Sequence, residues 1–238
     1  SLFSNKTLNK EKKGPVVRNF ILDQSKGRII ATTETDGILI FNTEYDFLKQ
    51  FSLPNSYSSK IEIVGALNLK SNNFLFASTG GLFESDLEDG KFQQILPDEI
   101  PFCRSVTSIG ENLFLVTQRN GASIVRYEFD GAKLVYRLIK KDIFAEYRFN
   151  FAEIDPSKKL WLGTLSDGAL RFNTVSDFIN ESGSGYDYFK SNSGLLRVSS
   201  FKSIGNTDLW MGTFDKGVYQ FNTSTNPFKT SDSKSEFD

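Results

Sequence analysis

Five basic residues stand near the starts of five apolar segments, where their side chains could bind an anion. They are Arg18, Lys60, Arg104, Arg148 and Arg197. Arginine can hold a carboxylate, sulfate or phosphate group through two parallel hydrogen bonds. If the five segments are equivalent in the fold, we expect these cations to point at one surface and bind an anionic group. The alternative is that they bind carbonyls or nearby carboxylates within the fold.

Further polar and aromatic residues in the predicted loops belong to the same candidate ligand-binding site. They are Arg119, Asp167, Asp215, Tyr147 and Phe214. The charged members also suit solvated turns. Phe102, Tyr186 and Tyr188 also lie in or beside these loops and are candidates for an aromatic platform that binds a carbohydrate. The alternative is chance, since the chain has 23 Phe and 8 Tyr.

Residues suited to catalysis are scarce. The chain has no histidine, which excludes Ser-His-Asp and Cys-His hydrolysis and His-ligated zinc. The single cysteine, Cys103, is expected to be buried. Four carboxylates lie on predicted inner strands: Asp23, Glu62, Glu153 and Asp155. They do not recur at one position of the repeat, so they do not suggest the paired carboxylates of a glycosidase. We therefore predict no catalytic residue, no metal and no cofactor.

Composition excludes several classes of partner. Lys and Arg number 28 and Asp and Glu 29, giving a net charge of -1 without long runs of like charge. Binding to nucleic acid or to an anionic membrane is therefore not expected. The apolar runs are far shorter than the roughly 20 residues of a membrane helix, so we expect no direct membrane insertion. The first residues contain no signal-peptide pattern, and we expect a mature or excised segment.

The chain repeats itself. Residues 160–173 and 209–222 begin 49 positions apart and are identical at seven of fourteen positions. Weaker copies start near residues 28, 74 and 113. A hydroxyl residue marks the end of each apolar run: Thr32, Ser78, Thr117, Thr164 and Thr213. The five units are predicted at residues 15–55, 56–98, 99–142, 143–192 and 193–238.

Each unit predicts four antiparallel strands and no convincing helix. A central hairpin turns at a glycine expected to have positive φ: Gly37, Gly81, Gly121, Gly168 or Gly217. An apolar strand precedes the hairpin and an aromatic-bearing strand follows it. This pattern predicts an all-β fold, a single β-propeller domain of four-stranded blades over residues 1–238. Either five blades close a ring, with residues 2–4 supplying a closing strand, or they form part of a larger propeller.

Two further features follow from this fold. Trp161 and Trp210 are expected in the cores between blades. Residues 174–192, the longest stretch between hairpins, are either a lid or partner-contact loop or a plain insertion.

The last two units resemble the two-component regulator propeller repeat. The matching residues are Leu160-Trp-Leu-Gly-Thr followed by Gly168-Ala-Leu-Arg-Phe-Asn, and Leu209-Trp-Met-Gly-Thr followed by Gly217-Val-Tyr-Gln-Phe-Asn. The resemblance implies the input domain of a hybrid sensor kinase, located in the periplasm or outside the cell, that senses oligosaccharides. It also implies more blades than five, usually seven, and places any kinase in a part of the parent protein outside this chain.

These observations lead to three functional hypotheses. The first is a non-enzymatic sensing propeller that binds a small molecule or oligosaccharide, with an anionic group on the ligand and a homodimer or further blades as partners. The second is a scaffold for protein interactions that uses a blade face or residues 174–192. The third, less favoured, is a carbohydrate-active enzyme with two carboxylates about 5 to 10 Å apart.

Overall fold

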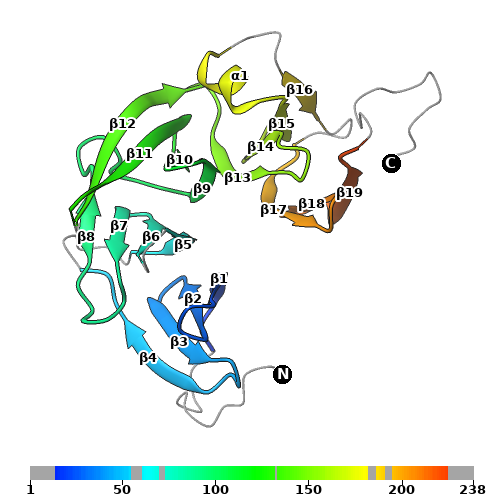
Figure 1. Cartoon of the computed structure of the whole chain (residues 1–238). Helices are drawn as coiled ribbons and strands as arrows, with labels where there is room; N and C mark the ends of the chain where they lie inside the picture. The colour runs from blue at the N-terminus through cyan, green and yellow to red at the C-terminus, as the bar shows by residue number, and fades with distance from the viewer. Residues whose placement is uncertain are drawn as a thin grey trace, which may run out of the picture. The chain divides into compact units, whose positions relative to one another are not determined.

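The computed structural model describes residues 14–54, 61–69, 73–131, 133–181, 186–190 and 195–224. They form five antiparallel sheets (Figure 1). The chain divides into two compact units between Val106 and Thr107. The first two sheets belong to the first unit. The fourth and fifth belong to the second, together with nearly all of the third.

In each sheet the strands follow one another in chain order. The first sheet contains β1 (Val17–Asp23), β2 (Arg28–Thr33), β3 (Ile38–Asn42) and β4 (Phe47–Phe51). The second contains β5 (Ile63–Asn68), β6 (Phe74–Ser78), β7 (Gly81–Ser85) and β8 (Gln93–Ile95). The third contains β9 (Ser105–Gly110), β10 (Leu113–Thr117), β11 (Ala122–Asp130) and β12 (Lys133–Ile143). The fourth contains β13 (Phe149–Ile154), β14 (Leu160–Thr164), β15 (Ala169–Phe172) and β16 (Tyr186–Phe189).

The fifth sheet has three described strands, β17 (Val198–Ile204), β18 (Asp208–Thr213) and β19 (Val218–Asn222). Sheets of this form, repeated along the chain, are the blades of a β-propeller, and the predicted fold class is confirmed. The predicted closing strand, residues 2–4, lies outside the described residues.

A hydroxyl closes the central hairpin of four sheets. It donates a hydrogen bond to the carbonyl of the loop glycine. The bonds join Thr33 to Gly37, Ser78 to Gly81, Thr164 to Gly168 and Thr213 to Gly217, at 2.8, 2.8, 2.9 and 2.8 Å. The same oxygen accepts a loop N–H at 2.7 to 3.1 Å. Thr33 therefore marks the first repeat. The prediction of Thr32 was wrong by one residue because two threonines stand side by side.

The predicted loop glycines all have positive φ. The values are 76° for Gly37, 115° for Gly81, 70° for Gly121, 81° for Gly168 and 78° for Gly217. At Gly168 a Cβ atom would also lie 2.0 Å from the carbonyl oxygen of Phe189 on β16. Glycine is required there both by the backbone angle and by the close approach of the outer strand.

The two tryptophans differ in burial. Trp161 on β14 is fully buried, and its ring centroid lies 5.1 Å from that of Phe221 and 6.0 Å from that of Phe201 in the fifth sheet. Trp210 on β18 is 36% exposed, so its predicted core position was wrong. The reason is its place along the chain. The fifth sheet covers Trp161, whereas Trp210 lies on the last described sheet.

Two other local predictions have clear outcomes. Cys103 is buried, as expected, and burial raises the pKa of its thiol. One short helix, α1 (Val175–Ile179), was not predicted. Thr174 and Asp177 form a capping box at its start, and Phe178 anchors it in the core of the third and fourth sheets. Residues 174–192 thus contain a helix and the strand β16, which was predicted.

Candidate functional site

The predicted cations have different surroundings. Arg18 donates a hydrogen bond to Glu34 at 2.8 Å, which agrees with the alternative that a carboxylate within the fold binds it. The guanidinium of Arg104 lies 5.3 Å from the ring centroid of Phe102. Arg148 is exposed, and its carbonyl accepts the N–H of Leu165 at 3.0 Å. Lys60 lies outside the described residues. That the cations share one surface stays a prediction.

Three predicted site residues meet in the fifth sheet. Arg197 lies 3.7 Å from the carboxylate of Asp215, and its guanidinium lies 5.3 Å from the ring centroid of Phe214. The backbone N–H of Phe214 donates to the Arg197 carbonyl at 3.0 Å. Because all three side chains are exposed, this ion pair is weak and can rearrange around a ligand.

A second group of predicted residues lies in the loops of the third and fourth sheets. Arg119 is exposed in the loop between β10 and β11, and Gly121 of that loop donates its N–H to the carbonyl of Tyr147 at 2.8 Å. Asp167 is exposed in the loop between β14 and β15 and forms an isolated bridge with Leu196. Arg148 directly follows Tyr147. Short backbone contacts therefore connect the segments that carry these four predicted residues.

Tyr147 is part of a tyrosine cluster, which consists of Tyr147, Tyr186 and Tyr188. Its ring stacks on Phe149 at 5.7 Å and meets Tyr188 edge-on at 6.3 Å. Burial, reinforced by a hydrogen bond with Tyr186, raises the pKa of the Tyr147 phenol. Burial and then the charge of Asp167 raise the pKa of Tyr188 to about 12. These phenols stay neutral at physiological pH and offer hydroxyls that both donate and accept hydrogen bonds.

Charged groups stand beside the tyrosine cluster. The ammonium of Lys190 lies 4.2 Å from the ring centroid of Tyr188. The effect of Asp167 on the Tyr188 pKa also places that carboxylate in the neighbourhood. Half-buried rings with hydroxyls, one cation and one carboxylate suit the binding of a polyhydroxylated molecule. Tyr186 and Tyr188 were candidates for an aromatic platform from their place in the sequence, and the structure places them beside Tyr147.

Two inner-strand carboxylates have partners within the fold. Asp155 accepts the indole N–H of Trp161 at 2.8 Å and the backbone N–H of Lys159 at 3.0 Å. Asp23 accepts a hydrogen bond from Arg28 at 2.7 Å and another from the Ser25 hydroxyl at 2.6 Å. Each carboxylate holds the turn that follows its inner strand.

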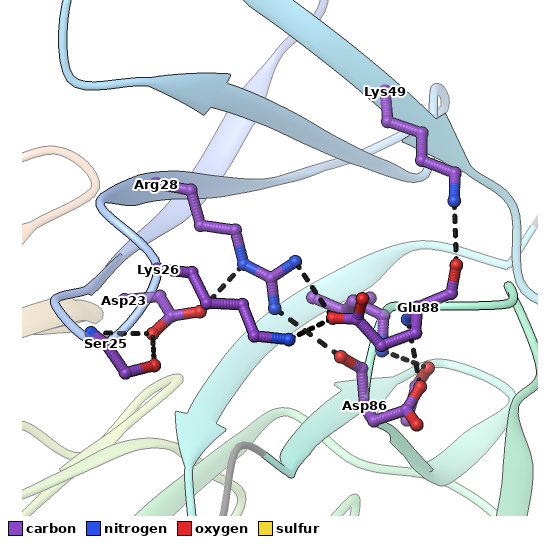
Figure 2. Close-up of polar contacts among 9 residues, drawn as sticks. Asp23, Ser25, Lys26, Arg28, Lys49, Asp86 and Glu88 are labelled. Carbon is purple, nitrogen blue, oxygen red and sulfur yellow. Dashed lines mark hydrogen bonds and ion pairs between the residues drawn. The ribbon is translucent and has the colours of Figure 1, made fainter.

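Arg28 connects the first two sheets (Figure 2). Its side chain is 11% exposed, and besides Asp23 it reaches Glu88, beyond β7, at 3.5 Å. Lys26 also pairs with Glu88, and Lys49 donates to the Glu88 carbonyl at 2.8 Å. Burial opposes ionisation of Asp23, but the hydrogen bonds from Ser25 and Arg28 outweigh it and hold its pKa below the ordinary value. This ion cluster stabilises the contact between the two sheets.

In the part of the chain that the structure describes, no three or more cysteine and carboxylate side chains gather closely enough to hold a metal ion. None of the helices there has the length and apolar character to cross a membrane.

No protein-family model matches the chain, and no curated protein matches it in sequence. Solved structures match its fold. The extracellular domain of the proposed hybrid two-component system BT4673 from B. thetaiotaomicron matches with a TM-score of 0.62 and 17% identity, over 96% of this chain and 28% of that one. The corresponding domain of BT3049 from the same organism matches with a TM-score of 0.62 and 14% identity, over 97% of this chain and 31% of that one.

Solved structures of proteins with other roles match as well. PorZ, a surface component of the type-IX secretion system of Porphyromonas gingivalis, gives a TM-score of 0.55 at 12% identity, over 89% of this chain and 34% of that one. The β-propeller domain of Swd1 from Myceliophteria thermophila gives a TM-score of 0.57 at 13% identity, over 94% of this chain and 70% of that one. The chain is thus similar in fold to extracellular propeller domains of two-component systems, and it spans less than a third of the length of the two matched here.

Proposed function

We propose that this chain is a non-enzymatic, ligand-binding part of the periplasmic or extracellular input region of a two-component system. The ligand is an oligosaccharide, and an anionic group on it is held by the exposed arginines. The observation that carries this proposal is the tyrosine cluster, which lies among loops that also carry Arg119, Arg148 and Asp167. The fold similarity to extracellular domains of two-component systems supports the setting.

The tyrosine cluster supports a carbohydrate ligand through its chemistry. Sugar rings present C–H faces that pack on aromatic rings and hydroxyls that exchange hydrogen bonds with phenols. Arg148 supplies a bidentate donor for a uronic carboxylate or a sulfate. Arg18 is less suited to this role because Glu34 already binds it.

The test is calorimetric titration of the chain with oligogalacturonates and with neutral malto-oligosaccharides. We expect binding of the acidic oligomers, at least tenfold weakened by Arg148→Gln. Tyr188→Phe, which keeps the ring and removes the hydroxyl, should weaken both classes. Arg18→Gln is the matched control and should leave affinity unchanged. Absence of binding across acidic and neutral oligomers, by folded protein, would contradict the proposal.

A second candidate function is a protein-interaction scaffold, favoured by the exposed apolar residues of the fifth sheet. Ile204 and Val218 are 54% and 64% exposed on the same sheet as Trp210. Trp161, the repeat equivalent of Trp210, is covered by a neighbouring blade, so the fitting partner is a blade of a second copy. Light scattering over a concentration series tests this. A dimer that Trp210→Glu dissociates supports it, and a monomer at all concentrations excludes it.

A further inference from the structure

The outer strand of the third sheet, β12, is longer than its counterparts. It has 11 residues, whereas the outer strands β4, β8 and β16 have 5, 3 and 4. Figure 1 shows it paired along its length with β11, and it is the last strand of its sheet. Within the described chain, no other strand pairs with its second edge. A long edge of this kind presents backbone N–H and C=O groups to any extended chain.

Among the described residues, polar contacts between β12 and the segment of α1 are at the C-terminal part of the strand. Lys140 donates to the carbonyl of Ile179 at 2.6 Å and pairs with Glu181 at 2.7 Å. Residues 133–139 therefore form the part of the edge available for pairing, which we call the β12 edge. Its length matches the five to seven residues that an added strand uses.

Five exposed side chains of β12, at every second position of the strand, alternate between basic and apolar. They are Lys133, Val135, Arg137, Ile139 and Lys141. Val135 and Ile139 are 39% and 46% exposed, while Tyr136 on the other face packs edge-on against Phe114 at 6.3 Å. The inward residues fix the register of the strand. The outward residues occupy every second position of the strand. An added strand would also place every second side chain on this face, next to them.

Two arginines stand opposite one another on this face. Arg137 on β12 pairs in register with Arg126 on β11, and both are exposed. Among the described residues, neither guanidinium takes part in an ion pair or a side-chain hydrogen bond. Like charges directly opposite in a sheet destabilise it. A carboxylate supplied by a bound strand next to Arg137 would relieve this repulsion.

The charge of β12 selects the partner. The strand has four basic residues, Lys133, Arg137, Lys140 and Lys141, against one acidic residue, Asp142. Of the carboxylates on β11, Asp130 lies directly opposite Lys133 and Glu128 lies opposite Val135, whereas Arg137 faces Arg126. Antiparallel pairing of β12 with a second copy centred on Arg137 would place basic residues against basic residues. The edge thus fits an acidic strand and disfavours its own copy.

We infer that the β12 edge binds an extended acidic segment of another protein as a fifth strand of the third sheet. The segment has carboxylates opposite Lys133 and Arg137 and apolar side chains opposite Val135 and Ile139, because cross-strand neighbours share a face. This interaction is independent of the proposed ligand site, which uses loops and not the edge of a sheet.

The test uses a fluorescent nine-residue peptide in which Glu and Val alternate at every second position, separated by Thr. Fluorescence anisotropy measures its binding to the whole chain. We expect saturable binding, at least tenfold tighter than that of the same peptide with Lys in place of Glu. The double variant Arg126→Glu, Arg137→Glu should reverse this preference. Lys216→Glu, an exposed cation elsewhere, is the matched control and should have no effect.

N-methylated peptides distinguish strand addition from attraction between charges alone. One peptide carries N-methyl groups on its odd-numbered residues and the other on its even-numbered residues. In an added strand only one of these two sets donates hydrogen bonds to the β12 edge, so only one of the two peptides loses those bonds. One peptide should lose at least tenfold in affinity and the other should retain binding. Equal binding of both, or no binding of the parent peptide at millimolar concentration, overturns the inference.

Discussion

Asp23 and Asp155 perform the same task in different units of the molecule. Each stands at the end of an inner strand and accepts hydrogen bonds from the turn and from the first residues of the next strand. Asp155 orients the buried Trp161, and Asp23 holds the guanidinium that reaches the second sheet. From the sequence, these carboxylates were considered for acid–base chemistry. In the structure they hold turns and side chains of the fold in place.

Asp23→Asn tests the strength of the ion cluster. The substitution leaves the charge of Arg28 largely buried with one fewer partner, so we expect a loss of about 3 kcal/mol in unfolding free energy at pH 7. The folded-state pKa of Asp23 lies below the ordinary 3.8. Its contribution is therefore fully present above that pH and is lost as the pH falls through the lower folded-state value. Urea unfolding between pH 2.5 and 7 should show the two proteins converging in acid.

Glu153→Gln, unlike Asp23→Asn, should raise the unfolding free energy at pH 7. Burial raises the pKa of Glu153, although the charge of Lys202 partly offsets this effect. The protonated form is thus favoured in the folded state, and stability from this group declines as the pH rises above its ordinary 4.5. We expect the variant to gain about 1 kcal/mol at pH 7 and nothing near pH 4. The exposed Glu146→Gln is the control, and a loss of stability at pH 7 would refute the argument.

At the scale of the element, the central hairpin is closed by a hydroxyl that donates a hydrogen bond to one backbone group of the turn and accepts one from another. In the fourth sheet Thr164 is fully buried, whereas Thr213 in the fifth sheet makes the same two bonds in a partly exposed position. A buried oxygen has no water to replace a lost partner. The same motif is therefore worth more in one blade than in the other.

Thr164→Val and Thr213→Val form a matched pair that measures this difference. Valine keeps the branched shape and removes the hydroxyl. We expect Thr164→Val to lower the unfolding free energy by about 2 kcal/mol and Thr213→Val by about 0.5 kcal/mol, since water can reach the second site. Chemical unfolding of both variants gives the comparison. Equal losses would show that burial does not control the contribution.

At the scale of the whole molecule, the two tryptophans report on the packing of successive blades. Trp161 is covered by the fifth sheet and Trp210 is 36% exposed. Acrylamide should quench the emission of Trp210 and leave most of that of Trp161. The Trp210→Phe variant should then resist quenching, and the Trp161→Phe variant should be quenched almost completely. Similar quenching of both single-tryptophan variants would contradict the described burial.

The blade pattern could be predicted because local chemistry determines it. The five loop glycines, the apolar strands and the hydroxyl before each loop recur at recognisable spacings, and the structure confirms the strands that they predicted. The error at Thr32 arose where two candidates for one role were adjacent. Helix α1 was missed because a five-residue helix leaves almost no periodicity, and a capping box with one buried phenylalanine defines it.

The candidate site was less predictable because it depends on which loops meet. Arg197, Phe214 and Asp215 of the fifth unit lie together, whereas Arg18 is paired with Glu34, and spacing in the sequence does not reveal either contact. Trp210 shows the same limit, since a repeat predicts the identity of a residue and its neighbours decide its burial. The positions equivalent to Arg28 are Lys159 in the fourth unit and Asp208 in the fifth, so the repeat does not predict its role, and only the structure shows its reach into the second sheet.

The hydroxyl and glycine that close the hairpins of the first, fourth and fifth sheets have a consequence for protein engineering. The threonine hydroxyl bonds only backbone groups of the turn, so the side chains between the threonine and the glycine are free to differ. They do differ: Glu34-Thr-Asp36 in the first sheet, Leu165-Ser-Asp167 in the fourth and Phe214-Asp-Lys216 in the fifth. Three-residue segments exchanged among these three turns, or randomised in parallel, would give a library of new binding surfaces on one unchanged scaffold.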